Sequence, residues 1–180
     1  MDFKDLAEKR YSCRQFTDKK VDDELIKKII DTANAAPTAV NRQPFKIFNM
    51  KSQKAKEAIG RVTRYTFGAD TFLVVGYKED EGWVRPYDNR PFADVDGSIA
   101  ATHIMMEIKD LGLDTTWVGY FDAPLLKELC PEMKDYQLIA IFPIGYAHET
   151  EGQPSPRHAQ RKSTDEIYSE LKHQSGRGNQ

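Results

Sequence analysis

The chain has 180 residues, 39% of them hydrophobic and 30% charged, which is typical of a globular protein with one substantial core. Its formal net charge of −2 argues against a protein that holds nucleic acid, because such proteins carry a basic excess. No apolar run is long enough to cross a bilayer, and the first residues are charged. We therefore expect neither a signal peptide nor an association with membranes.

The chain contains two cysteines, Cys13 and Cys130. Without a secretion signal they indicate reduced thiols, so we expect a cytoplasmic protein. Two cysteines are too few for a structural zinc site with the usual four ligands.

Helical periodicity predicts a short amphipathic helix over residues 2–9, with Phe3 and Leu6 on one face. Asp22 is a good N-cap for a second helix, which Pro37 stops. Further helices are expected over 53–62, over 93–111 with Gly112 as its end, from Pro124 to before Pro131, and over 164–171.

Apolar runs predict strands over 45–50, 72–77, 115–120 and 138–144. The last run is almost wholly apolar, which indicates burial on both faces. Pro143 cannot donate to a ladder, so we expect that end at an edge or a bulge. Residues 78–91 are expected to form a loop. Because helices and strands alternate irregularly, the pattern favours a mixed α+β sandwich.

We expect one domain over residues 1–172, followed by a disordered tail over 173–180. Residues 150–160 are polar and contain two prolines, which is unusual for a segment packed on its own domain. We therefore expect residues 150–172 to form an arm that crosses the surface of a partner subunit.

Three clusters carry candidate chemistry. The run 10–16 places two arginines and a serine within a few residues, and these groups match phosphate oxygens, although a solvated turn has the same composition. The run 36–45 is stiffened by two prolines and presents the polar side chains of Thr38, Asn41 and Gln43, which can bind the edge of a heterocycle. A plain connection between a helix and a strand would have the same composition. In the run 112–122 a strand ends at Gly119 among aromatics, where a flat ring can approach the backbone, or a buried strand simply turns.

A fourth cluster is Ile144-Gly145-Tyr146, followed by Arg157, Arg161 and Lys162. Taken in order, the motifs R-x-S-x-R-x-F, A-P-T-x-x-N-x-Q-P-F, G-L-x-T-x-W-x-G and I-G-Y with a late arginine resemble the nitroreductase family of flavoproteins. The resemblance extends from about Phe3 to about Tyr168. It implies a three-layer α/β/α sandwich with a mixed, largely antiparallel sheet and a domain-swapped C-terminal arm. It also implies a homodimer that holds two FMN molecules at its interface.

The resemblance also assigns residues. Arg10 and Arg161 would meet the FMN phosphate, Arg14 would lie near the pyrimidine ring, and the backbone N–H near Gly119 would point at flavin N5. The Pro37 loop would come from the opposing subunit. The full set implied to bind the cofactor is Arg10, Tyr11, Ser12, Arg14, Pro37, Thr38, Ala39, Asn41, Gln43, Asp96, Thr116, Trp117, Val118, Gly119 and Arg161.

The activity implied is transfer of hydride from NAD(P)H through flavin N5 to an electron-poor acceptor such as a nitroaromatic or a quinone, in a ping-pong cycle. No catalytic side chain is needed, because the cofactor carries the chemistry. Residues 78–91 would replace the longer lid of many relatives, with Trp83, Arg85 and Tyr87 as candidate pocket residues.

Other interpretations remain open at this point. The same fold serves flavin-dependent dehydrogenases or oxidases, and a flavin-binding dimer without catalysis would carry the same motifs. A metal site at His103 and Glu107 is disfavoured, because no further His or Cys lies at ligand spacing. Cys13 is either a thiol of lowered pKa beside arginines or a buried spectator.

Overall fold

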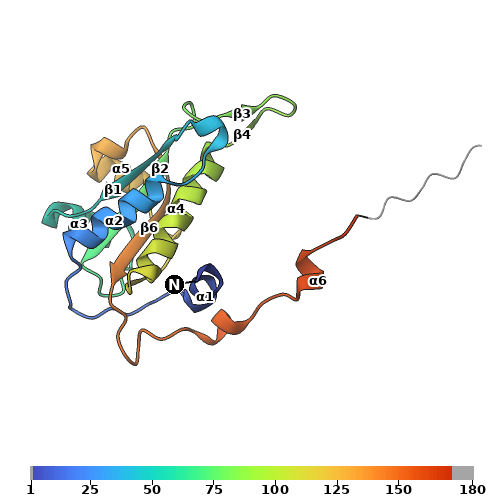
Figure 1. The fold of residues 1–180 in the computed structure, drawn as a ribbon. Helices are drawn as coiled ribbons and strands as arrows, with labels where there is room; N and C mark the ends of the chain where they lie inside the picture. Colours follow the sequence, from blue (N-terminus) through green and yellow to red (C-terminus); the bar gives the residue numbers. More distant parts are fainter. Residues whose placement is uncertain (1, 172–180) are drawn as a thin grey trace, which may run out of the picture.

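The computed structural model describes residues 2–171. Its centre is a four-stranded antiparallel sheet in the order β1-β2-β6-β5 (Figure 1). The strands are β1 (Phe45–Asn49), β2 (Thr71–Tyr77), β6 (Gln137–Gly145) and β5 (Asp114–Thr115). The expected mixed character of the sheet is limited to one parallel bridge between Ser12 and Thr115.

Helices cover both faces of the sheet, so the sandwich predicted from the sequence is confirmed. In β2, Leu73 and Val75 pack on one side, while Phe72 and Val74 pack on the other. This alternation follows from the period of two in a strand. Helices α2 (Asp23–Asn34) and α4 (Ala93–Asp110) cover the first face, and α3 (Gln53–Val62) and α5 (Ala123–Leu129) cover the second.

The remaining elements are short. Helix α1 (Phe3–Lys9) packs against α4, and β3 (Val84–Arg85) pairs with β4 (Arg90–Pro91) in a two-stranded ribbon. The others are the 3-10 turns η1 (Ala39–Asn41), η2 (Pro131–Met133) and η3 (Pro156–Ala159), and the helix α6 (Thr164–Ile167). None of the helices in residues 2–171 is long and apolar enough to cross a membrane.

Helix boundaries follow their capping residues closely. The carboxylate of Asp22 accepts from Glu24 N at 3.0 Å, as the sequence predicts. The helix over 53–62 begins where expected, with Ser52 as its cap. After α4, Gly112 adopts a φ of +76°, a left-handed conformation that glycine takes without cost.

The predicted strand over 115–120 is wrong in extent. Only Asp114–Thr115 pair continuously with β6, and an isolated bridge joins Val118 to Ile141. Both pairings share one register, which places Thr116 opposite Pro143. Since proline has no N–H, the ladder is interrupted at that point.

Pro143 itself does not lie at a sheet edge, as the sequence suggested, because β6 is an interior strand. Nor does it lie at a bulge, since the register shift between β2 and β6 falls between Val75 and Gly76. Instead, the missing donor faces the β5 side, and the Pro143 carbonyl accepts from Thr115 Oγ1 at 2.7 Å. The proline therefore leaves the pairing with β2 intact.

One smaller expectation also fails. The stretch 78–91 is not a plain loop, because it contains the β3–β4 ribbon, where Phe92 N donates to Trp83 O at 2.9 Å. Phe3 and Leu6 do share one face of α1, since both line a groove between α1 and α4, although Leu6 is buried and Phe3 is 73% exposed.

The C-terminal segment leaves the body of the molecule (Figure 1). Every residue over 159–171 is exposed. The segment starts from a fixed point, because His148 N donates to Gln15 O at 3.0 Å and Gly152 N donates to His148 O at 2.9 Å. The tail predicted over 173–180 lies outside the described residues.

Gly97 of α4 tests how closely this helix must approach the sheet. A Cβ at this position would lie 2.5 Å from Ile139 Cδ1. The Ile139 methyl can turn aside, but Tyr77 Cβ lies 3.5 Å from the same position, so we predict that Gly97→Val lowers the free energy of unfolding by about 1 kcal/mol through overpacking. The matched change Gly60→Val on α3, where a Cβ meets nothing within 4 Å, should change it by about 0.5 kcal/mol or less. Chemical denaturation at equal protein concentration measures both, and equal effects would contradict the close approach.

Candidate functional site

The segment 10–16 runs along the edge of the sheet beside β5. Cys13 N donates to Thr115 O at 3.0 Å, and Phe16 N donates to Phe67 O at 3.1 Å. These bonds fix the backbone of the arginine-rich motif against the core. The motif is therefore a built part of the fold and not a solvated turn.

Arg10, at the start of this segment, lies near enough to Arg161 for the two charges to interact. The pKa of Arg10 is lowered by burial and by the neighbouring charge of Arg161. No ion pair within residues 2–171 involves either arginine. Two like charges held together without a carboxylate form a site that an anion would stabilise.

The C-terminal arm brings Arg161 to this place. His158 Nε2 lies 3.1 Å from Glu8 O, and its ring packs edge-on against Tyr11 at 6.2 Å. Arg161 Nη1 donates to the carbonyls of His158 and Gln160. The structure thus joins Arg10 and Arg161 from opposite ends of the chain.

Neighbouring groups of the motif differ in exposure. Burial, followed by Asp114 and Cys13, raises the pKa of Tyr11 to about 12, so its hydroxyl stays protonated at neutral pH. Cys13 is fully buried, and burial raises the pKa of its thiol despite the nearby charges of Lys109 and Arg14. The hypothesis of a thiol activated by arginines is therefore wrong. Arg14 is exposed, and its Nη1 donates to Ser12 O at 3.3 Å.

The Pro37 loop has a strained backbone, which is stabilised by hydrogen bonds between residues of the loop itself. Val40, Asn41 and Gln43 have φ values of 47°, 58° and 51°, which are unusual for residues with a side chain and most unusual for a β-branched one. Thr38 Oγ1 accepts from Gln43 N at 3.0 Å, and Gln43 Nε2 donates to Asn41 Oδ1 at 3.0 Å. Three polar side chains of the loop, those of Thr38, Asn41 and Gln43, thus stabilise its own backbone conformation.

Asp96 anchors this loop from the first turns of α4. The side chain is 1% exposed, and its Oδ1 accepts from Ala39 N at 2.8 Å. Its Oδ2 is buried and has no hydrogen-bond partner among the residues that the structure describes. Asp96 therefore acts on the loop as a positioning residue.

The strand end at Gly119 is open. Thr116 and Val118 are buried, while Trp117 is half-buried and packs edge-on against Phe142 at 5.3 Å. Gly119 is exposed, and a Cβ there would meet only Trp117 Nε1, at 4.0 Å. Nothing in the chain's own packing requires glycine at this position, which leaves its backbone accessible to a flat ligand.

One chain does not bring all the predicted residues together. Asp96 holds the Pro37 loop near the start of α4, whereas Lys109, near its end, lies 4.9 Å from the Tyr11 ring. Thirteen residues of helix separate the two contacts by about 20 Å. Figure 1 shows η1 and α1 at opposite ends of α4. The first group comprises Arg10, Tyr11, Ser12, Arg14, Thr116, Trp117, Val118, Gly119 and Arg161, and the second Pro37, Thr38, Ala39, Asn41, Gln43 and Asp96.

The loop that follows α3 also borders the site, although no motif in the sequence predicts it. Phe67 has a φ of 53° and accepts from Phe16, and Thr63 Oγ1 donates to Tyr120 O at 2.9 Å. This loop therefore borders both the arginine motif and the Gly119 turn. In the sequence this loop is marked only by two aromatic residues, Tyr65 and Phe67, before Gly68. Such a pattern does not predict that Phe67 takes a left-handed backbone conformation.

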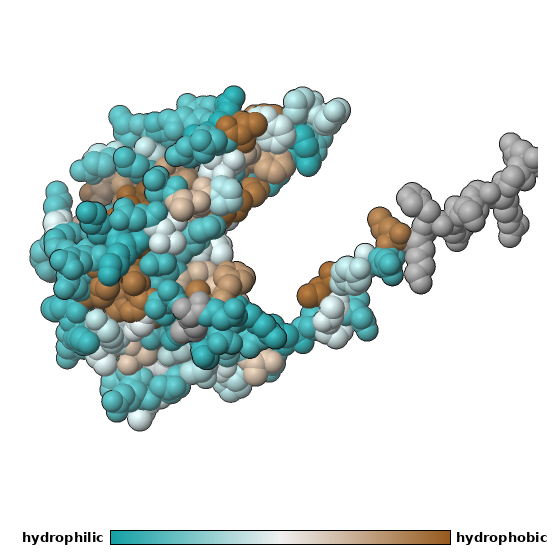
Figure 2. Space-filling model, viewed as in Figure 1, coloured by the Kyte–Doolittle hydropathy of each residue, from teal (hydrophilic) through white to brown (hydrophobic). Residues whose placement is uncertain are grey.

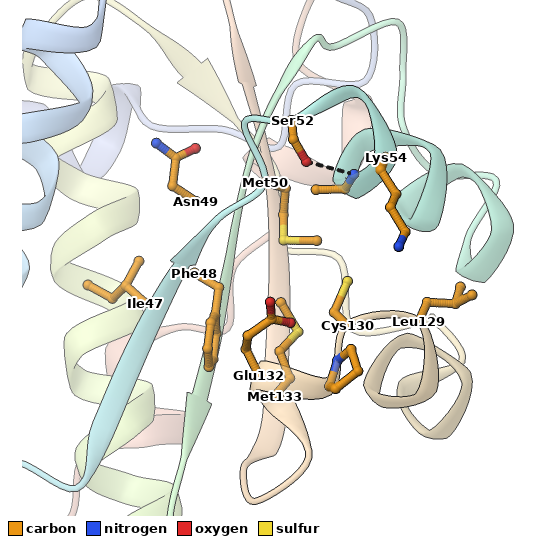
Figure 3. A pocket seen from close by; sticks show the side chains of 12 residues that line it. Ile47, Phe48, Asn49, Met50, Ser52, Lys54, Leu129, Cys130, Glu132 and Met133 are labelled. Carbon is orange, nitrogen blue, oxygen red and sulfur yellow. Dashed lines mark hydrogen bonds between the residues drawn. The ribbon is translucent and has the colours of Figure 1, made fainter.

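A separate hollow of 440 Å³ lies between β1, α3 and η2 (Figure 3). None of the predicted cofactor residues lines it. Ser52 faces it, but its Oγ already accepts from Ala55 N at 3.2 Å. Burial raises the pKa of the Cys130 thiol there. This hollow therefore has no part in the predicted cofactor site.

Metal ligands do not converge anywhere in residues 2–171, where no group of three His, Cys, Asp or Glu side chains is placed to hold an ion. His103 Nδ1 lies 2.9 Å from Ile99 O of its own helix.

The fold and the site define an α+β sandwich with a cluster of arginines at the edge of its sheet. The model of the nitroreductase family matches residues 7–67 and 64–146. A nitroreductase family protein from Clostridium difficile 630 is similar in structure, with a TM-score of 0.85, 32% identity, and coverage of 94% of this chain and 98% of that one. The chain therefore belongs to the nitroreductase family.

Two other relatives are informative. A protein of Methanothermobacter thermautotrophicus, provisionally named NADH dehydrogenase/NAD(P)H nitroreductase, is 27% identical over 166 residues, which cover 84% of this chain and 81% of the relative. A nitroreductase of Exiguobacterium sibiricum 255-15, solved in complex with FMN, has a TM-score of 0.79 at 19% identity, covering 95% of this chain and 98% of that one. The second likeness shows the fold alone.

The role of Asp96 can be tested by hydrogen exchange. Asp96→Ala leaves the Ala39 N–H without its acceptor, so we predict faster exchange over residues 38–43 and a loss of about 1–3 kcal/mol of unfolding free energy. Asp96→Asn keeps one acceptor oxygen and should retain most of the protection. Unchanged exchange of the loop in the alanine variant would contradict the anchoring role.

Proposed function

We propose that this protein is an FMN-dependent oxidoreductase that takes hydride from NAD(P)H and delivers it to an electron-poor acceptor such as a nitroaromatic or a quinone. The observation that carries the proposal is the Arg10–Arg161 pair, which has no carboxylate partner in residues 2–171 and lies at the sheet edge of a nitroreductase-family fold. The FMN in the structure of the Exiguobacterium sibiricum relative supports the choice of cofactor.

The phosphate end of FMN would lie between Arg10 and Arg161. Guanidinium groups bind phosphate oxygens through charge-assisted hydrogen bonds, and Ser12 supplies a hydroxyl beside them. Burial and then the charge of Arg161 lower the pKa of Arg10, and an anion would offset the repulsion between the two arginines. The residues present therefore fit a phosphate-bearing cofactor.

The ring end of FMN would lie against the Trp117–Gly119 backbone. When bound, FMN supplies the hydride chemistry at N5, so the protein needs no catalytic acid or base of its own. The exposed Gly119 backbone would contribute an N–H at that atom, and the cationic Arg14 would stabilise negative charge on the pyrimidine ring.

A second copy of this chain would complete the site. A groove of 590 Å³ between α1 and α4 has Phe3, Leu6, Ala7 and Met106 in its lining, together with Arg10. Figure 2 shows the molecule hollowed on the side from which the C-terminal arm extends. The arm carries Ile167, Tyr168 and Leu171, all more than 60% exposed. Apolar side chains of this kind favour burial against a partner.

The partner would also supply the second half of the site. The Pro37 loop lies about 20 Å along α4 from Tyr11 in one chain. In a homodimer the loop of one protomer can meet the arginine motif of the other. Arg42 Nη1 donates to Gly82 O at 3.1 Å, so the neighbouring 78–91 segment, with Trp83, Arg85 and Tyr87, would accompany the loop to the pocket.

The visible spectrum of the purified protein tests the function. We predict flavin bands that bleach when NADPH or NADH is added without oxygen. Arg10→Ala should weaken FMN binding about tenfold or more, because a charge-assisted hydrogen bond is worth about 1.5–3 kcal/mol. Lys9→Ala, which removes an exposed charge from the neighbouring residue, is the control and should retain FMN. A bound flavin that neither donor reduces would favour a non-catalytic dimer, and a protein that takes up no FMN would refute the proposal.

The arm can be tested by truncation. Ending the chain after Thr150 removes Arg161 and α6, so it should reduce both dimer stability and FMN retention. Ending it after Ser163 removes α6 but keeps Arg161, so it should weaken the dimer with a smaller effect on FMN at high protein concentration. Light scattering measures the mass, and a stable dimer in both variants would mean that the arm does not hold its partner.

A further inference from the structure

A second basic hollow lies beside the exposed Gly119 turn. It has a volume of 540 Å³ and is lined by residues 60–65 together with Tyr120. This volume is within the range of about 300–1,000 Å³ that is usual for small-molecule sites. None of its lining residues belongs to the predicted FMN set.

The charge of this hollow is not neutralised by the chain. Arg61 and Arg64 are exposed and take part in no ion pair within residues 2–171. The carboxylates of Glu57 and Asp122 are the nearest in sequence to the lining residues, but neither forms an ion pair within residues 2–171, and both accept hydrogen bonds from neutral amides. Glu57 accepts from Gln53 Nε2 at 3.1 Å, and Asp122 caps α5 by accepting from Leu125 N at 2.9 Å.

Aromatic rings stand beside these arginines. The Arg64 guanidinium lies 5.1 Å from the centre of the Tyr65 ring, and its Nη2 donates to Tyr65 Oη at 3.1 Å. Tyr65 and Tyr120 meet edge-on at 6.0 Å, and Tyr120 is 81% exposed. An exposed aromatic face next to guanidinium groups without a carboxylate partner in residues 2–171 is a surface suited to a nucleotide base and its phosphates.

The hollow is held at a fixed position relative to Gly119. Thr63 Oγ1 donates to Tyr120 O at 2.9 Å, and Asp122 N donates to Val62 O at 3.0 Å. These bonds tie the end of α3 to the turn on both sides of Tyr120. A dinucleotide whose reactive ring reached Gly119 would therefore find basic and aromatic groups next to it.

We propose that this hollow binds the adenylate half of the nicotinamide donor, with Arg64, assisted by Arg61, on the 2′-phosphate and Tyr120 against the base, so that the enzyme prefers NADPH to NADH. This inference rests on the proposed function, in which flavin N5 lies at the Gly119 backbone, so that a nicotinamide ring delivering hydride to N5 would have to reach that turn. It adds the identity of the donor and the residues that select it.

Two measurements on the FMN-loaded protein test the hollow. Calorimetric titration with 2′,5′-ADP and with 5′-AMP reports binding of the adenylate half without any turnover. We expect the wild-type protein to bind 2′,5′-ADP at least tenfold more tightly, and Arg64→Ala to remove most of that difference. Arg64→Lys should keep part of it, because it keeps the charge.

Rapid anaerobic reduction of the flavin supplies the second measurement. Arg64→Ala should raise the Kd for NADPH about tenfold, with little change for NADH and an unchanged limiting rate. Lys134→Ala, which removes an exposed charge that does not line the hollow, is the control and should change neither Kd.

The outcomes separate the two proposals. Equal wild-type affinity for 2′,5′-ADP and 5′-AMP, or a preference that Arg64→Ala leaves intact, would overturn the assignment of the hollow while flavin reduction still proceeded. Flavin that neither donor reduces would overturn the proposed function, and the titration with 2′,5′-ADP would still decide whether the hollow selects a 2′-phosphate.

Discussion

The packing of α4 against the sheet is the constraint on which both parts of the site depend. Gly97 lets the helix approach so closely that a Cβ would lie 2.5 Å from Ile139. One helical turn carries Gly97 and the Asp96 that holds the Pro37 loop. At the other end, Lys109 pairs with Asp114 at 2.7 Å and lies over Tyr11. A rigid helix therefore sets the separation between the loop and the arginine motif, and that separation is what a second protomer would have to bridge.

The site is costly for the isolated chain. It holds two guanidinium groups together, a loop with three left-handed residues, and a buried carboxylate oxygen without a partner in residues 2–171. Strain and unpaired charge of this kind usually persist where a ligand or partner offsets them. An anionic cofactor between Arg10 and Arg161 offsets the repulsion, and a partner subunit seated on the Pro37 loop would support its shape. Binding of FMN and of a second protomer would therefore offset both the charge repulsion and the backbone strain of the isolated chain.

The two arginine pairs belong to different parts of the chain. Arg10 follows α1 and Arg161 lies in the C-terminal arm, while Arg61 and Arg64 lie at the end of α3. The loop over 63–68 connects these regions, because Phe67 accepts from Phe16 and Thr63 donates to Tyr120. Such an arrangement would give the cofactor phosphate and the donor phosphates separate cations, so that the donor can leave without loosening the flavin.

The sequence by itself determined the elements whose signals are local. Asp22, Ser52 and Gly112 set helix ends through hydrogen bonds and backbone freedom within a few residues, and apolar runs predicted the buried strands. The ordered motifs also identified the family. Only the tertiary structure decided that Pro143 interrupts the pairing of Thr116, that Phe67 takes a left-handed conformation, and that Arg161 reaches Arg10. Each of these depends on residues far apart in the chain, whose approach is fixed by packing and not by local propensity.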